Sequence, residues 1–121
     1  LINRTVFGKQ FAKLFPSPPP AAELDLFWEL IRHNDGHRNY HLLIRYLNER
    51  KRHELVWLDA LAASKVPLTV IWGQRDPVSV PAIAKEVLLR RPDAKYVPLH
   101  EVGHYPQWED PQTVAQHILR A

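Results

Sequence analysis

Two residues able to transfer protons, Asp76 and His104, each stand just behind a short apolar segment of the chain. Asp76 follows residues 66–72 and His104 follows residues 94–99, with a glycine close to each. A carboxylate that accepts a hydrogen bond from one imidazole nitrogen fixes the ring tautomer, and the other nitrogen can then act as a general base. Asp76 and His104 therefore predict acid–base chemistry if the fold brings them together.

The segments around these residues indicate how they would meet. Residues 66–72 are short, nearly all apolar and rich in β-branched and aromatic residues, as is typical of a strand buried on both faces of a parallel sheet. Residues 81–91 have helical spacing, and residues 94–99 form a second strand candidate. A strand, helix, strand order predicts a right-handed parallel crossover. Asp76 and His104, 28 residues apart, would then lie at the same edge of the sheet, where ligands bind in such folds.

The rest of the chain has helical periodicity. Helices are expected over residues 3–15, from Pro20 to a turn at Asn34-Asp35-Gly36, and over residues 37–50, 54–63 and 111–120. Glu109 and Asp110 are expected at the positive start of the last helix, in a structural role. The sequence thus predicts an α/β fold, with a helical segment over residues 1–64 and a sheet-bearing segment over residues 65–121.

Composition excludes several classes of protein and of site. With 121 residues, 45% of them hydrophobic and 24% charged, the chain is typical of one modest globular domain. It contains no cysteine, which excludes disulfides, a thiolate nucleophile and cysteine-ligated metals. No apolar run is long enough for a membrane span. The net charge of +3 is too small to indicate a nucleic-acid partner by itself.

Two observations predict that the chain is part of a longer protein. It begins with Leu1 and contains no methionine. Two parallel strands also cannot cover both faces of a sheet by themselves. We therefore expect a missing N-terminal part of the same fold as its partner, and expect the isolated chain to associate or to stay partly unfolded.

The two segments with proton chemistry resemble a known family. The sequence VPLTVIWGQRDPV (66–78) is similar to the acid-bearing strand of α/β-hydrolase-fold enzymes, and VGHYPQWEDP (102–111) resembles their catalytic-histidine loop. The resemblance implies that Asp76 is the acid and His104 the base of a catalytic triad, with no metal or organic cofactor. Residues 1–64 would be the last helices of the cap domain, and residues 65–121 the C-terminal part of the core domain.

A narrower resemblance concerns the helical segment. Asn34-Asp35-Gly36, the helix over residues 40–52 and Trp57 look like the cap of mesoderm-specific-transcript-type hydrolases, near the epoxide hydrolase and haloalkane dehalogenase branch. Cap tyrosines polarise the substrate oxygen in epoxide hydrolases, which implies the same for Tyr40 or Tyr46. Pockets for small apolar substrates are lined mainly by apolar and aromatic side chains. The candidate substrate-binding residues are therefore Trp28, Tyr40 and Tyr105, the last at the pocket rim.

The family also needs a nucleophile, which this sequence lacks. The nucleophile stands between glycines in a Gly-x-Nuc-x-Gly turn, and the four glycines, Gly8, Gly36, Gly73 and Gly103, do not bracket one. A serine nucleophile would hydrolyse esters through an acyl-enzyme, and an aspartate would open epoxides or haloalkanes. The 121 residues alone are therefore expected to be inactive. The alternative is a non-catalytic binding protein on the same fold.

Two other patterns suggest chemistry but have simpler explanations. His33, His37 and His41 have a spacing that could stack three metal ligands on a helix, but the turn at residues 34–36 interrupts it, which favours surface or packing roles. The basic residues of the 45–57 stretch suggest a nucleic-acid module. Acidic residues interleave with them, which favours a solvated helix face.

Overall fold

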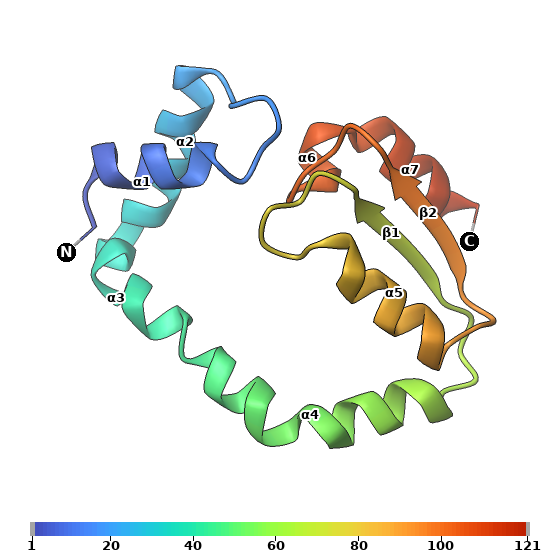
Figure 1. The fold of residues 1–121 in the computed structure, drawn as a ribbon. Coiled ribbons are helices and arrows are strands. Elements are labelled where there is room, and N and C mark those ends of the chain that lie inside the picture. The colour runs from blue at the N-terminus through green and yellow to red at the C-terminus, as the bar shows by residue number, and fades with distance from the viewer. Residues whose placement is uncertain (1, 121) are drawn as a thin grey trace.

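A computed structural model describes residues 2–120 of the chain (Figure 1). Its N-terminal half is helical, and the elements in order are α1 (Arg4–Ala12), α2 (Ala21–Arg32), a 3₁₀ turn (His33–Asp35), α3 (Gly36–Leu43) and α4 (Tyr46–Ala63). The C-terminal half alternates strands and helices: β1 (Thr69–Gly73), α5 (Pro81–Arg90), β2 (Lys95–Leu99), α6 (Pro106–Glu109) and α7 (Pro111–Leu119). The chain is therefore of the α/β class.

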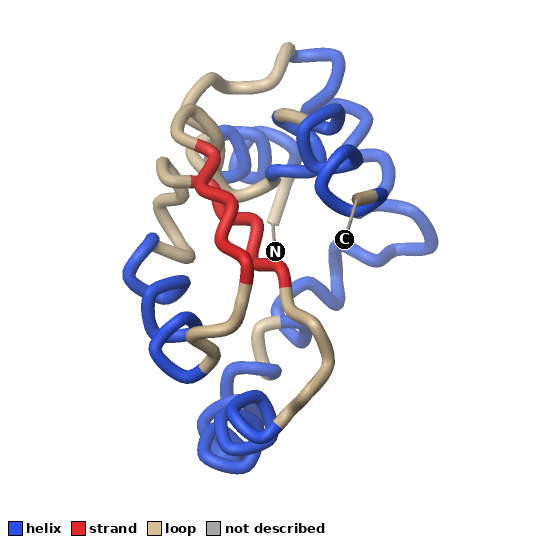
Figure 2. The backbone as a smooth tube through the Cα atoms, turned by 90° about the vertical axis from the view of Figure 1, so that its right-hand side faces the viewer, coloured by secondary structure: helices blue, strands red, loops and turns tan. Residues whose placement is uncertain are grey.

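The sheet is formed by the two parallel strands, in register from Thr69 opposite Lys95 to Gly73 opposite Leu99. Helix α5 makes the crossover and lies on one face of the strands, while α7 lies on the other face (Figures 1 and 2). Val97, Leu99 and Val102 form the buried cluster of this half. Pro98 stands within β2, and since proline has no N–H to donate, β2 has the character of an edge strand.

The helical half has its own small aromatic core. Phe7 is 2% exposed and contacts Phe11 and Trp28, with ring centroids 5.1 and 5.8 Å apart. The Asn3 side chain caps α1 by accepting a hydrogen bond from the Val6 N–H. Helices α3 and α4 contain no buried residue and follow a long arc toward β1 (Figure 1). No helix within residues 2–120 has the length and apolar character needed to cross a membrane.

The turn between α2 and α3 was expected, and its detail is informative. Asn34 and Asp35, rather than Gly36, take the left-handed conformation, with φ of 49° and 58°. These two residue types tolerate that region better than most. Gly36 is needed for a different reason, because a Cβ there would lie 2.7 Å from the Ile31 carbonyl oxygen.

The helix boundaries after this turn were predicted wrongly. The expected break near residues 51–53 does not occur, since α4 is continuous over Tyr46–Ala63, and the chain instead breaks at Ile44 and Arg45. Residues 51–53 contain neither glycine nor proline, so nothing there interrupts the helical hydrogen bonds. The strand boundaries differ by only a few residues, since β1 begins at Thr69, after Pro67.

Candidate active site at the carboxyl ends of the strands

Asp76 is held by the turn that follows β1. One oxygen of its carboxylate, Oδ1, accepts hydrogen bonds from the N–H groups of Val78 (2.8 Å) and Ser79 (2.9 Å). The residue is 8% exposed although it follows an exposed arginine, Arg75. A buried carboxylate needs such partners because desolvation is costly without them. The turn therefore fixes both the position of the carboxylate and the direction in which its free oxygen points.

His104 lies in the loop after β2 and contacts that carboxylate. Its Nδ1 is 2.8 Å from Asp76 Oδ2 and 3.0 Å from Oδ1. Because a carboxylate only accepts, Nδ1 carries the proton and donates it, which leaves Nε2 as the nitrogen with a free lone pair. The imidazole side chain remains 27% exposed, against 7% for Asp76. This geometry can deliver a general base at Nε2.

Close contact between the two strand ends explains why these loops meet. A Cβ on Gly73 would collide with the carbonyl oxygens of Gly103 and Val102, so the two loops touch through their backbones. The N–H of Arg75 donates to the Val102 carbonyl at 2.9 Å, and the N–H of Gln74 donates to Leu99 at 2.9 Å. Glycine is required at position 73 because the backbones approach so closely.

A cavity of about 770 Å³ opens beside His104, between the end of β1 and the helices α3 and α4. Its lining is mainly apolar and aromatic, and includes Tyr40, Leu43, Ile44, Tyr46, Leu47, Arg50, Trp72, Val78, Ser79, Ile83 and His104. A smaller hollow of about 190 Å³ lies against Asp76, His104, Ser79 and Gly73. His104 thus borders both spaces, and Asp76 borders only the smaller one.

The three aromatic candidates for substrate binding occupy different places. Tyr40 lines the larger cavity together with His104. Tyr105 meets the His104 ring edge-on at a centroid distance of 5.0 Å and stacks on Phe15 at 5.4 Å. Burial, together with the nearby Tyr40 and Asp76, raises the pKa of Tyr105, so its hydroxyl stays protonated. Trp28 is 8% exposed and packs in the aromatic core against Phe7 and His37, away from this cavity.

Sequence reasoning missed the contacts of Glu109. Its carboxylate accepts hydrogen bonds from the N–H groups of Gly103 and Tyr105, the residues on either side of His104. The N-cap of α7 is Asp110 alone, which accepts from the Thr113 N–H at 3.1 Å. The adjacent carboxylates Glu109 and Asp110 indicate a helix cap in the sequence, but they do not indicate which N–H groups Glu109 contacts.

In the described residues, 2–120, no cluster of three histidine or acidic side chains is arranged to hold a metal ion. The three histidines around the turn illustrate this. His37 packs against Trp28, while His41 Nδ1 lies 3.0 Å from the Arg38 carbonyl.

Comparisons with known proteins place this geometry in context. No protein-family profile matches the chain, and no solved structure matches it significantly. Its sequence is 40% identical over 121 residues to "Putative hydrolase LipZ" of Mycobacterium tuberculosis, covering 98% of this chain and 42% of that protein. It is 33% identical over 115 residues to the human "Mesoderm-specific transcript homolog protein", covering 92% of this chain and 34% of that protein. The mouse protein is 32% identical over the same length.

The chain is therefore related to a protein named as a hydrolase, and it spans about two fifths or less of the length of the relatives it matches.

Proposed function

We propose that this chain is the C-terminal part of an α/β-hydrolase in which His104 is the general base and Asp76 orients it. The single observation that carries the proposal is the contact of His104 Nδ1 with Asp76 Oδ2 at 2.8 Å, beyond the carboxyl ends of two parallel strands. Relationship to a protein named as a hydrolase supports it. Residues 1–64 would form cap helices, and residues 65–121 the end of the core domain.

In the proposed reaction, His104 Nε2 removes a proton from a nucleophile or from water. Asp76 keeps the proton on Nδ1 and stabilises the imidazolium that forms. With a serine nucleophile, the hydroxyl oxygen attacks an ester carbonyl and Nε2 later returns the proton to the leaving alcohol. With an aspartate nucleophile, an alkyl-enzyme ester forms, and His104 activates the water that hydrolyses it.

The nucleophile would come from a segment outside the 121 residues. Pro98 marks β2 as an edge strand, so a further strand is expected to pair with the other side of β1. That addition would bring new residues toward the hollow against Asp76 and His104. The proposal needs no metal or organic cofactor.

The proposed substrate is a small, largely apolar ester, epoxide or haloalkane. The cavity beside His104 is lined mostly by apolar and aromatic side chains, which favours such a ligand. Tyr40 lines the same cavity and is the first candidate for contacting a substrate oxygen.

The isolated 121-residue chain is expected to be inactive and to associate. Many apolar side chains of α3 and α4 are exposed, for instance Leu43 at 67% and Leu55 at 76%. Apolar patches of this kind promote association. Sedimentation of the isolated chain as a folded monomer would contradict this expectation.

The decisive test uses the full-length protein that contains this chain. Hydrolysis of p-nitrophenyl butyrate and of styrene oxide is measured for the wild type, His104→Gln and Asp76→Asn. We expect kcat/KM to fall by about 10³–10⁴-fold in both variants, since each removes one member of a cooperating group. His100→Gln is the matched control, because His100 is exposed in the same loop.

Wild-type activity in His104→Gln would overturn the proposal. Together with tight binding of a small apolar ligand, it would favour a non-catalytic binding protein on this fold.

A further inference from the structure

We propose that Glu109 is a positioning residue for His104, holding the loop residues on both sides of the imidazole. This inference rests on the proposed function of His104, and it assigns to Glu109 a role beyond the start of a helix. Glu109 touches neither Asp76 nor the imidazole. It acts on the backbone that carries His104.

The geometry is that of a two-point clamp. Glu109 Oε2 accepts the N–H of Gly103 at 2.8 Å, and Oε1 accepts the N–H of Tyr105 at 3.0 Å. The N–H between them, that of His104, donates to the Leu14 carbonyl oxygen at 3.1 Å. The backbone N–H groups of three consecutive residues, 103–105, therefore all donate to partners outside that three-residue segment.

Local structure makes this clamp short and stiff. Glu109 ends α6, which starts directly after Tyr105, and its own N–H donates to the Tyr105 carbonyl at 2.9 Å. The Glu109 carboxylate, at the end of α6, thus binds the loop that immediately precedes α6. Gly103 has no room for a side chain, because a Cβ there would lie 2.6 Å from Pro16 Cδ and 3.3 Å from Glu109 Oε1.

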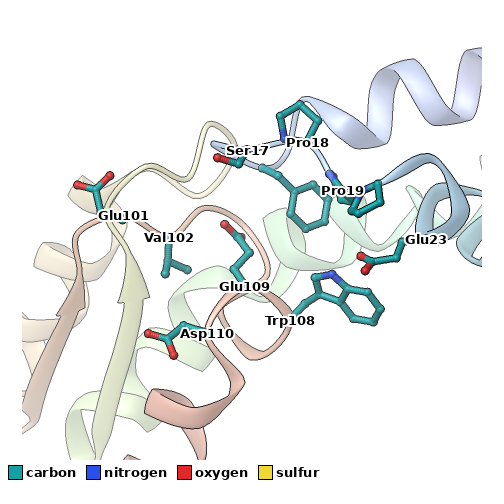
Figure 3. Close-up of a pocket in the computed structure, with 11 residues that line it drawn as sticks. Ser17, Pro18, Pro19, Glu23, Glu101, Val102, Trp108, Glu109 and Asp110 are labelled. Atoms are coloured by element: carbon teal, nitrogen blue, oxygen red, sulfur yellow. The ribbon is translucent and has the colours of Figure 1, made fainter.

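The Glu109 carboxylate neither caps α7 nor pairs with a cation among the described residues. Asp110 caps α7, and the two carboxylates point in different directions from the same stretch of chain (Figure 3). Among residues 2–120, Glu109 forms no salt bridge. Its carboxylate oxygens are committed to the two backbone N–H groups, and hydrogen bonds to an ionised acceptor are stronger than neutral ones.

A glutamine at position 109 would keep the shape and lose half of the clamp. The amide oxygen can accept from one N–H, but the amide nitrogen has no lone pair and would face the other N–H. Gly103 or Tyr105 would then move away, and the His104 ring with it. Small displacements of a catalytic group are costly, with losses near a hundredfold for about 1 Å.

The test compares Glu109→Gln with Asp110→Asn in the full-length protein. Asp110→Asn is a matched control because it changes the neighbouring carboxylate, which caps α7 and makes no contact with the His104 loop. We expect Glu109→Gln to lower kcat by about tenfold to a hundredfold with little change in KM. We expect Asp110→Asn to leave kcat unchanged, because the asparagine amide oxygen can still accept the Thr113 N–H.

A readout independent of turnover separates this inference from the proposed function. In protein with ¹⁵N-labelled histidine, NMR reports the tautomer of His104 and the width of its Nδ1–H signal. We expect Glu109→Gln to broaden the Nδ1–H signal, because the contact of Nδ1 with Asp76 Oδ2 is held less firmly, and Asp110→Asn to leave this signal as in the wild type. An unchanged Nδ1–H signal in Glu109→Gln would overturn the positioning role, even with His104 proven essential.

If His104→Gln keeps full activity, the proposed function fails and the positioning role fails with it. If Glu109→Gln does not fold, Glu109→Asp replaces it, because this variant keeps the charge and shortens the reach by one methylene. Failure of both variants to fold, with Asp110→Asn folded, would assign Glu109 a purely structural role and overturn the proposal.

Discussion

The sheet-bearing half of the chain, residues 69–119, and the helical half, residues 4–63, differ in whether they bury charged side chains. Both halves have exposed ion pairs, but among the described residues only the sheet-bearing half has pairs with a buried member. In the sheet-bearing half Asp76 is buried and pairs with His104 across 28 residues of sequence. In the helical half the ion pair of Arg4 with Asp25 has side chains 63% and 46% exposed. Exposed pairs contribute little to stability, whereas buried groups must be satisfied.

The same contrast holds for apolar groups. The sheet-bearing half buries Val97, Leu99 and Val102 in one cluster. Helices α3 and α4 contain no buried residue, and the aromatic cluster of α1 and α2 forms the core of the helical half. The helical half nevertheless contacts the candidate site. The Leu14 carbonyl accepts the His104 N–H, and the rings of Phe11 and Phe15 pack against Tyr105. The sheet-bearing half therefore holds the proposed base and its aspartate, while the helical half contacts the loop that carries His104 and lines the cavity.

The largest expected effect comes from a pair of glycine substitutions, one in each half. Gly73→Ala should destabilise the full-length protein by about 3 kcal/mol, because a Cβ would strike the backbone of the His104 loop. Gly8→Ala, in the interior of α1 with nothing within 4 Å of its Cβ position, should stabilise it by about 0.5–1 kcal/mol. Urea denaturation measures both. If both substitutions changed the free energy of unfolding in the same direction, the contrast drawn between the two halves would be wrong.

A second pair compares two aspartates. Asp76→Ala leaves the N–H groups of Val78 and Ser79 and the His104 ring without their acceptor, and should cost about 2–3 kcal/mol of unfolding free energy. Asp25→Ala removes only the exposed pair with Arg4, and should cost less than about 1 kcal/mol. Both losses of unfolding free energy are measured by urea denaturation of the variants and the wild type at the same pH. Equal costs would show that burial is not what distinguishes the halves.

The smallest effect concerns the junction between the halves and depends on pH. The guanidinium of Arg91, which is 3% exposed, donates to the Val66 carbonyl at 2.8 Å and to both carboxylate oxygens of Asp93. The hydrogen bonds to the carboxylate lower the pKa of Asp93 from 3.8 to about 2. A lowered pKa contributes stability above the unfolded value, and this contribution disappears as the pH falls through the folded one. Asp93→Asn should therefore be less stable than the wild type at pH 6, with the difference fading between pH 4 and pH 2.

Urea midpoints at each pH test this last prediction. A difference that stays constant down to pH 2 would mean that the ionic contact does not carry the effect.

Much of the candidate site could be anticipated from local patterns. Asp76 and His104 follow apolar strand-like segments, and parallel strands bring their carboxyl ends to one edge. The turn at Asn34 and Asp35 was likewise readable from residue types that tolerate positive φ. The break at Ile44 and Arg45 was not, because neither residue has a strong preference against a helix.

The sequence by itself determined the α/β class, the strand, helix, strand order of residues 69–99, and the two candidate residues for proton chemistry. These depend on residue type and on spacing along a short stretch of chain. Only the tertiary structure decided that Trp28 packs in the aromatic core, that Tyr40 faces the cavity with His104, and that Glu109 clamps the loop. Those contacts depend on how the elements pack and how loops fold back, and such distances are not encoded in any local pattern.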